Sequence, residues 1–468
     1  MQTALNVRTF PAAQWWSVLA VIVCAAVTML AFRSPVPTLS FVFGAAALFI
    51  GVRFPMGMLL LYAGSLILFQ VPLAGEGEDG IAVPTATGTV FLLSTALYLV
   101  TTRSFVRLKS WVPTILLLLA VLFPFCALLN PDWVSAHPRG LLTYEILLVT
   151  TFAVAQILHD SKWAWTLGRV LIVAAVLVSM LAVYETWTGH YNPFGLFPTE
   201  PGRAYGLADP NYTAALVVTL LPFLIANFLI RRHVVFGILA ALQVALACAA
   251  IAMTSSRGGV IGAMTTAVAI IAWVCPKRGT LIGGEEKRSR NAAYPRGRAC
   301  VVALMLLGLS AAILLAPNIL WERLATLEQW SDPTEVHGSR IPLWTIYAEE
   351  WLQSPWWGHG PGYLDTRETT PYAHNTLLQV LLEVGAFGFA GFVLLNCVGF
   401  LEALRARRRF ARNGEASLSL LSGAVAASLV GFHSTAFFLN SATHKELWLL
   451  LGFASALHHM SHSKGIAS

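Results

Sequence analysis

This chain has 468 residues, of which 57% are hydrophobic and only 11% are charged, and its net charge is +7. Soluble domains contain about 25% charged residues, so the composition excludes a soluble globular protein and predicts a polytopic membrane protein. The positive charge does not indicate a nucleic-acid partner, because the basic residues lie in short connections between apolar runs, where the positive-inside rule explains them. The six cysteines lack CxxC spacing and predict neither a disulfide nor a zinc site.

Apolar runs long enough to span a bilayer recur along the chain, since a span needs about 20 mainly apolar residues. Several of the early runs are short, and we expect some of them to be merged or re-entrant. The predicted spans lie near residues 15–32, 36–52, 56–72, 87–101, 111–129, 140–158, 164–186, 209–230, 234–253, 258–275, 299–317, 375–400, 416–433 and 445–459.

Basic residues occupy alternate connections between these spans, and this pattern predicts the orientation of the chain. They lie in the connections that contain Arg103 and Lys109, residues 231–232, residues 277–298, and residues 405–412. Assigning these connections to the cytoplasm places both termini there and the remaining loops outside. The chain then divides into an N-terminal helical bundle (1–316), a large external loop (317–374) and C-terminal transmembrane helices with a short tail (375–468).

The external loop contains more acidic than basic residues and six tryptophans. Residues 339–352 have apolar side chains at helical spacing, which predicts an amphipathic helix along the membrane surface. Pro355 and the glycine-rich stretch 358–362 then end the helix and turn the chain back.

Three polar motifs fall on the predicted external side, although the orientation depends on loop charges alone. They are Gly202-Arg203-Ala204-Tyr205-Gly206 with Asp209-Pro210-Asn211, Thr254-Ser255-Ser256-Arg257-Gly258-Gly259, and the external loop with Arg340, His374 and Asn375.

The arginines of these motifs each have two interpretations. Arg257 lies between two apolar runs and could be a snorkelling anchor at the headgroups. Hydroxyls before it and glycines after it also suit a phosphate site, which uses open N–H groups at a helix N terminus. Arg203 is either a loop cation or a second anion ligand, and Arg340 could instead pair with Glu349 or Asp332. Arginines on one face would stabilise a leaving pyrophosphate without a metal.

No DxD pair, HExxH motif or cluster of carboxylates at metal-ligand spacing occurs in the external loops, so neither a metal nor a cofactor is predicted. His374 lies where the polar loop re-enters an apolar run, and it could be a general base or an interfacial or capping residue. Asn375 could orient an acceptor hydroxyl or cap the following helix. Four other histidines are weaker candidates because none lies beside such a motif: His337, His359, His433 and His444.

Together these residues resemble the family of bacterial O-antigen ligases and the related O-antigen polymerases. In the ligases the external loop ends with His, then Asn, Ser or Gln, nine residues, and Gly-x-x-Gly, Thr or Tyr. The stretch from His374 to Gly388 matches this pattern in full. Ser256-Arg257-Gly258 and Arg340 with Trp344 resemble further family elements, and Arg203 belongs to a looser one.

This resemblance implies an all-α, GT-C-like bundle of about twelve (12–14) transmembrane helices in the inner membrane of a Gram-negative bacterium. It implies transfer of O-antigen from undecaprenyl pyrophosphate to a hydroxyl of the lipid A–core oligosaccharide, in lipopolysaccharide biosynthesis at the periplasmic face. His374 would be the general base, and Arg257, Arg203 and Arg340 would hold the pyrophosphate. A monomer would carry out one inverting displacement without a metal.

Three other functions remain open. An O-antigen polymerase would join one lipid-linked repeat to another, and a protein O-oligosaccharyltransferase of the same superfamily would use a serine hydroxyl as acceptor. A non-enzymatic transporter or binder would use the arginines only to hold an anionic lipid. The complete histidine motif favours the ligase, and the lack of an evident inverted repeat in the sequence disfavours transport.

Overall fold

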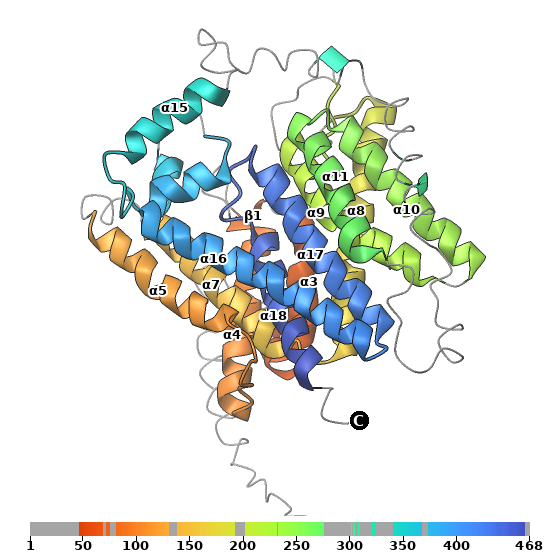
Figure 1. The fold of residues 1–468 in the computed structure, drawn as a ribbon, viewed down its shortest axis with the longest axis horizontal. Helices are drawn as coiled ribbons and strands as arrows, with labels where there is room; N and C mark the ends of the chain where they lie inside the picture. The colour runs from red at the N-terminus through yellow and green to blue at the C-terminus, as the bar shows by residue number, and fades with distance from the viewer. Residues whose placement is uncertain are drawn as a thin grey trace, which may run out of the picture.

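The apolar runs form a bundle of long helices, accompanied by one very short hairpin (Figure 1). A computed structural model describes residues 46–68, 72–74, 81–130, 138–191, 202–231, 233–275, 340–366 and 373–463, together with a few isolated positions between 301 and 322. The fold class is all-α and polytopic, as predicted.

Most of the long helices agree with the predicted spans to within a few residues, and the labelled elements also include a hairpin and short helices. They are α3 (Pro55–Ser65), η1 (Leu66–Leu68), β1 (Pro72–Ala74), β2 (Ile81–Ala82), α4 (Val83–Thr102), α5 (Val112–Leu128), α7 (Pro138–Ile157), α8 (Ser161–Thr188), α9 (Pro210–Ile230), α10 (Val234–Met253), α11 (Arg257–Ala269), η3 (Ile270–Val274), α15 (Arg340–Trp351), η6 (Tyr363–Thr366), α16 (Thr376–Arg412), α17 (Ala416–Ala436) and α18 (Lys445–Ser463).

Within the described residues, eight helices are long and apolar enough to cross a membrane, or nine if a bent pair near the N terminus counts as one span. These eight are α4, α7, α8, α9, α10, α11 with η3, α16 and α17. Helix α18 lies inside the bundle against α7 and α16, with Trp448 fully buried. The predicted span 15–32 lies outside the described residues, as does most of 299–317.

The predicted spans 36–52 and 56–72 are not two straight spans in the described part. Residues Ala46–Arg53 and Pro55–Leu68 form two helices bent by 118° relative to each other. Pro55 explains the bend, because proline lacks an N–H and disfavours helical backbone in the preceding residue. Such a pair is either one broken span or a re-entrant hairpin.

Small residues bring the central helices close together. Helix α17 packs against α9, α11 and α16. A Cβ added to Gly262 of α11 would lie 2.4 Å from Thr435 of α17, and one added to Gly431 would lie 2.7 Å from the Thr266 hydroxyl. Lipid tails are as apolar as the helix side chains, so burial of apolar surface does not drive helices together in a membrane. Close packing at small residues drives their association instead.

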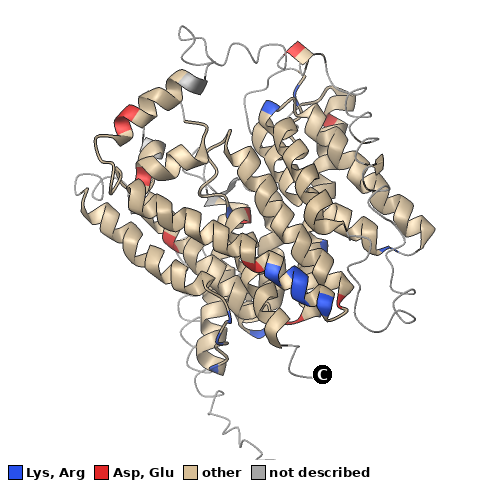
Figure 2. Ribbon diagram, in the orientation of Figure 1, with Lys and Arg blue, Asp and Glu red and all other residues tan. Residues whose placement is uncertain are grey.

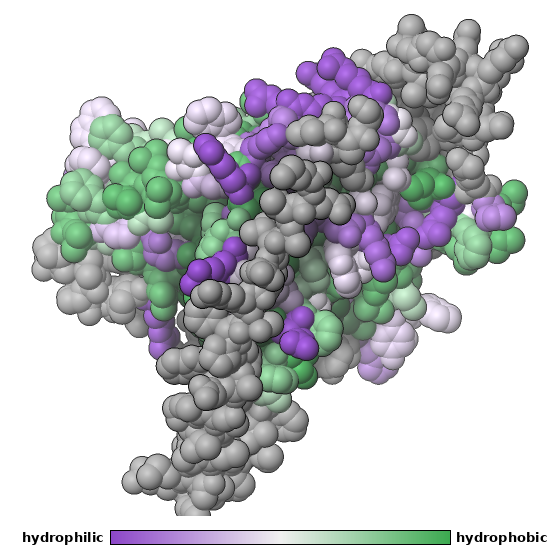
Figure 3. Space-filling view, turned by 90° about the horizontal axis from the view of Figure 1, so that it is seen from below, coloured by the Kyte–Doolittle hydropathy of each residue, from purple (hydrophilic) through white to green (hydrophobic). Residues whose placement is uncertain are grey.

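The two ends of the bundle differ in charge. Figure 2 shows lysines and arginines gathered at the lower end, where α4 and α16 end, and Figure 3 shows hydrophilic surface across that end from below. There the Lys109 N–H donates to His459 Nδ1 at 3.2 Å, and the Ser419 hydroxyl donates to the Arg407 carbonyl at 3.0 Å. Two of the connections predicted to be cytoplasmic therefore share one end, and the histidine motif lies at the other.

Helix α15 forms as the sequence predicts for residues 339–352. Its buried face carries Leu343 and Tyr347, one turn apart. Tyr347 packs with Leu364, Ala373 and Leu382 in a small cluster of its own. This cluster fixes α15 over the start of α16 (Figure 1).

Candidate functional site

One loop lies at the centre of the candidate site: residues 437–444, which connect α17 to α18 and are called the α17–α18 loop below. In the described part of the chain, four helices begin around it: α9, α11, α16 and α18. On α9, the Tyr212 hydroxyl donates to the Asn440 carbonyl at 3.4 Å. At the start of α11, a Cβ on Gly258 would lie 3.0 Å from Phe438. Helix α18 begins directly after the loop.

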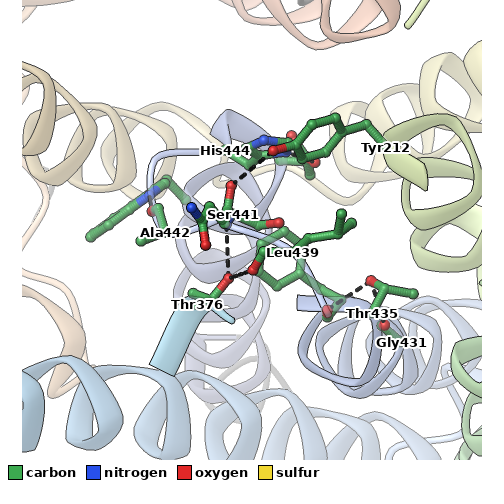
Figure 4. A network of polar contacts seen from close by, with 12 residues as sticks. Tyr212, Thr376, Gly431, Thr435, Leu439, Ser441, Ala442 and His444 are labelled. Atoms are coloured by element: carbon green, nitrogen blue, oxygen red, sulfur yellow. Dashed lines mark hydrogen bonds and ion pairs between the residues drawn. The ribbon is translucent and has the colours of Figure 1, made fainter. Parts of the chain in front are cut away.

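Helix α16 is tied to the same loop through its first residues (Figure 4). The Asn375 N–H donates to the Asn440 side-chain oxygen at 3.1 Å. The Thr376 hydroxyl donates to the Leu439 carbonyl at 2.7 Å and accepts the Ser441 N–H at 2.8 Å. The histidine motif is therefore anchored to the loop that also contacts α9 and α11.

The four helix starts at this loop differ in charge. Each N terminus carries roughly half a positive charge and several N–H groups without partners inside the helix. Asp209 caps α9 and Glu446 lies in the first turn of α18, whereas the caps of α11 and α16, Ser256 and Asn375, are neutral. The N termini of α11 and α16 therefore keep the positive ends of their dipoles uncompensated, and these favour an anion.

His374 is partly buried and has a left-handed backbone, with φ of 48°. Asn375 caps α16, because its side-chain oxygen accepts the N–H groups of Leu377 and Leu378 at 3.0 and 3.1 Å. The structure thus shows the capping function of Asn375. Its contact with an acceptor hydroxyl stays a prediction.

Helix α16 is broken at Gly385, whose φ and ψ are 64° and −171°. The Ala386 N–H donates to the carbonyl of Pro355, outside α16, at 2.9 Å. A Cβ on Gly385 would lie 2.4 Å from the Trp356 backbone. The first glycine of the histidine motif is therefore required where the loop after α15 enters the break.

The nine residues between Asn375 and Gly385 form a separate short helix, which is also anchored by polar contacts. The Tyr144 hydroxyl donates to Glu383 Oε2 at 2.7 Å, and Gln379 Nε2 donates to Glu383 Oε1 at 3.4 Å. Gln379 in turn accepts the N–H of Ala442, in the α17–α18 loop, at 3.4 Å. We call residues 376–384 the motif helix.

Arg257 is the first residue of α11 and is partly buried. The Ser256 hydroxyl caps this helix by accepting the Gly259 N–H at 3.2 Å. A Cβ on Gly259 would lie 2.6 Å from Ala214 of α9. The glycines that the sequence associates with phosphate approach thus let α11 begin tightly against α9 and the α17–α18 loop, and Arg257 lies at this junction.

Arg203 is only 3% exposed, and part of its guanidinium forms hydrogen bonds within the protein. Its Nε donates to the Thr254 carbonyl and its Nη2 to the Asn211 side-chain oxygen, both at 3.1 Å. These bonds link the loop before α9 to the turn before α11, so Arg203 lies beside the motif of Arg257. Arg203 therefore has a structural function, and its contact with pyrophosphate stays a prediction.

Glu185, near the end of α8, holds the same loop and was not predicted. Its Oε2 accepts the N–H groups of Tyr205 and Gly206 at 2.5 and 3.0 Å, and the residue is fully buried. An acid within the predicted span 164–186 is the signal that could have revealed it, because ionisable residues inside spans are rare and functional.

Arg340 is the first residue of α15, and its side chain lies outside the described residues. One turn later, the Trp344 indole N–H donates to the Ala373 carbonyl at 2.9 Å. The same ring meets Phe437 edge-on, with centroids 5.4 Å apart. Helix α15 is therefore fixed beside His374 and the α17–α18 loop, while the contact of Arg340 with pyrophosphate stays a prediction.

An open apolar groove of about 520 Å³ begins at the α17–α18 loop and runs between α11, α16 and α17. Phe437 and Phe438 line one part of it, and Phe400 and Leu429 line another. An Asn396–His433 hydrogen bond of 2.9 Å lies in its wall. The candidate site thus continues into an apolar groove among helices that can span a membrane.

The α17–α18 loop also brings in a histidine–carboxylate pair. His444 Nδ1 lies 3.1 Å from Glu446 Oε1, and the His444 ring packs on Tyr212 with centroids 4.7 Å apart (Figure 4). From the sequence alone His444 is a weak candidate, because no motif accompanies it. A polar stretch between two apolar runs, on the predicted external side, was the available signal.

Residues 242–393 match a family model described as O-antigen ligase. The match covers about a third of the chain and contains Arg257, α15, His374 and Gly385. Arg203 and the α17–α18 loop lie outside it. No curated protein matches this chain.

Proposed function

We propose that this chain belongs to the O-antigen ligase superfamily and transfers O-antigen glycan from undecaprenyl pyrophosphate to a hydroxyl of the lipid A–core oligosaccharide, at the periplasmic face of the inner membrane. The observation that carries the proposal is the convergence of four helix N termini, the Arg257 motif and the histidine motif on the α17–α18 loop. This arrangement joins an anion site to a candidate base.

The anion site suits a pyrophosphate leaving group. As the glycosidic bond breaks, its electron pair moves to a phosphate oxygen, and fixed positive groups stabilise the growing charge. Arg257 and the helix N termini would supply that stabilisation, with Arg203 and Arg340 as further ligands. Because guanidinium groups bind phosphate oxygens in a bidentate fashion, the proposed mechanism requires no metal.

His374 would act on the acceptor. Its imidazole takes the proton of the sugar hydroxyl while that oxygen attacks the anomeric carbon from the side opposite the pyrophosphate. One bond forms as the other breaks, so the configuration inverts. The cap of Asn375 and the contact of Trp344 with Ala373 hold the backbone on both sides of His374, as a positioned base requires.

The groove between α11, α16 and α17 would receive the polyprenyl chain of the donor. Its lining includes Ile261, Leu429 and Phe400, and it begins at the loop that carries the proposed pyrophosphate site. A lipid chain in this groove would place the pyrophosphate at the bundle end where a water-borne glycan acceptor is accessible.

The general-base function of His374 can be tested by chemical rescue. His374→Gly removes the imidazole and suits the left-handed backbone at φ of 48°. We expect ligation by purified protein to fall about 10²–10⁴-fold and free imidazole to restore part of it. The assay follows transfer of glycan from undecaprenyl pyrophosphate to lipid A–core by gel mobility. His190→Gly, at an exposed position after α8, is the control.

Normal ligation by His374→Gly, from protein that is folded and well expressed, would contradict the assigned base. The acceptor decides between related functions in the same assay. Extension of the donor without lipid A–core would indicate a polymerase, and transfer to a serine-containing peptide would indicate a protein O-oligosaccharyltransferase. Binding of the donor without any transfer would indicate a lipid binder.

A further inference from the structure

Asn440, in the α17–α18 loop, uses only one half of its side-chain amide within the protein. Its oxygen accepts the Asn375 N–H at 3.1 Å. Its nitrogen, Nδ2, is buried and has no hydrogen-bond partner within the part of the chain that the structure describes. Most buried polar side-chain atoms in proteins have a partner, and one without a partner calls for an explanation. Because this nitrogen belongs to the loop at the centre of the candidate site, a substrate atom is a candidate partner.

The contact with Asn375 determines which end of the amide is available. A backbone N–H can only donate, so it faces the oxygen of Asn440 and not the NH₂ group. Both hydrogens of Nδ2 therefore remain for an acceptor atom. A side-chain amide does not titrate near neutral pH, so this donor is present whatever the protonation state of the nearby histidines.

The backbone on both sides of Asn440 is held by one hydroxyl. Thr376 donates to the Leu439 carbonyl at 2.7 Å and accepts the Ser441 N–H at 2.8 Å (Figure 4). The Tyr212 hydroxyl adds a contact with the Asn440 carbonyl at 3.4 Å. Donors that are fixed in place stabilise a developing charge without reorganising during the reaction, and Asn440 meets this requirement.

Asn440 lies between the two helix starts that favour an anion. Its amide accepts a hydrogen bond from Asn375, the cap of α16. Phe438, two residues earlier in the loop, lies against Gly258 in the first turn of α11. The loop therefore places the Asn440 amide between the motif of Arg257 and the histidine motif.

We propose that Asn440 is a ligand of the lipid-linked pyrophosphate. Its Nδ2 donates a hydrogen bond to a phosphate oxygen, while the oxygen of the same amide holds the peptide that joins His374 to Asn375. As the bond between the anomeric carbon and the phosphate oxygen breaks, its electron pair moves onto the pyrophosphate, and the Nδ2 hydrogens stabilise that charge. No proton leaves the amide. This inference rests on the proposed function, and it assigns a catalytic residue outside the family match.

The acceptor hydroxyl is a less suitable partner for Nδ2. A donor directed at the attacking oxygen would bind the electron pair that forms the new glycosidic bond and would slow the attack. On the pyrophosphate, by contrast, the hydrogen bond strengthens as negative charge grows, and only such interactions accelerate the chemical step. The competing explanation is that Asn440 only holds Asn375 in place.

The experiment uses purified Asn440→Asp, which keeps the oxygen that accepts the Asn375 N–H and removes the nitrogen donor. We expect kcat for ligation to fall about 10²–10³-fold, as for loss of one donor to a developing oxyanion, and the acceptor KM to stay unchanged. Inhibition by added undecaprenyl pyrophosphate, a product of the reaction, should weaken at least about 10-fold. Asn413→Asp adds the same charge at an exposed position at the basic end of α16. This matched control should change none of these values.

Asn440→Ala separates the missing donor from repulsion by the new carboxylate, because it adds no charge. We expect it also to weaken inhibition by undecaprenyl pyrophosphate, and it decides the matter if Asn440→Asp does not fold. Wild-type inhibition in Asn440→Ala, or wild-type kcat and inhibition in Asn440→Asp, overturns the proposal. Equal losses for donor and acceptor with a lower melting temperature in Asn440→Asp also overturn it, because they indicate a structural role.

Direct binding of undecaprenyl pyrophosphate separates this inference from the proposed function. Wild-type protein that binds the lipid, loses affinity through Asn440→Asp and transfers no glycan refutes the ligase while supporting the pyrophosphate ligand. Ligation that continues unchanged in Asn440→Asp supports the ligase and refutes the ligand.

Discussion

His374 and Ser255 share an uncommon backbone conformation, with φ of 48° and 51°. Left-handed backbone costs a residue with a Cβ about 1–2 kcal/mol, and such strain persists where packing and function over-determine it. One of these residues precedes the cap of α16 and the other precedes the cap of α11. Both strained positions thus set the direction of a helix that begins beside the α17–α18 loop.

The guanidinium of Arg257 can be tested separately from its charge. Arg257→Lys keeps the positive charge but loses the planar fork that binds phosphate in a bidentate manner. We expect this variant to have a raised donor KM and Arg257→Ala to be worse, by roughly 10-fold or more. The assay is ligation by purified protein at varied donor concentration. Arg412→Ala, exposed at the basic end, serves as the control.

Full activity of Arg257→Lys would instead indicate that Arg257 is a simple anchor at the headgroups.

At Arg257 the sequence predicts the helix boundary correctly and explains the neighbouring glycines only in part. The Ser-Arg-Gly-Gly pattern marks a helix start, which α11 confirms. The contacts of Gly258 with Phe438 and of Gly259 with Ala214 involve residues distant in sequence, and local patterns do not reveal them.

The motif helix is a structural unit defined by two different stops. Asn375 begins it with a side-chain cap, and Gly385 ends it with a backbone conformation open essentially to glycine alone. Hydropathy predicts a span over 375–400, yet α16 continues to Arg412 and is broken within. The break could not be predicted, because it depends on the loop at Trp356 filling the gap.

Substitution of Gly385 tests this interpretation. Gly385→Ala adds backbone strain and a clash with Trp356, together about 2–6 kcal/mol. Gly414→Ala is the matched control, because Gly414 also has a positive φ of 75° but nothing within 4 Å of an added Cβ. We expect a clearly lower melting temperature in detergent for Gly385→Ala and a smaller loss for Gly414→Ala. Equal losses would show that the contact with Trp356 contributes nothing.

At the scale of the molecule, the two ends of the helical bundle differ in charge. The spans follow from composition, and most of their bounds agree with hydropathy within a few residues, because long apolar runs leave few alternatives. The candidate site follows only in part. The α17–α18 loop, with Asn440 and His444, lies more than sixty residues from His374 in sequence, and no motif marks that contact.

The orientation of the two ends can be measured by cysteine labelling. In a variant whose native cysteines are replaced by alanine, Glu349→Cys places a thiol on an exposed position of α15, and Asn413→Cys places one at the basic end. The positive-inside rule predicts that a membrane-impermeant maleimide labels Glu349→Cys in intact spheroplasts. It should label Asn413→Cys only after permeabilisation. The reverse pattern would place the proposed site in the cytoplasm.

The motif helix gives the spacing of the histidine motif a meaning in terms of angle. A helix turns about 100° per residue, so one inserted or deleted residue between Asn375 and Gly385 would rotate one end against the other by that amount. Glu383 would then point away from Tyr144, or Asn375 away from Asn440 in the α17–α18 loop. Apart from Thr376, Gln379 and Glu383, whose side chains form hydrogen bonds, the nine positions can therefore vary in identity far more freely than in number.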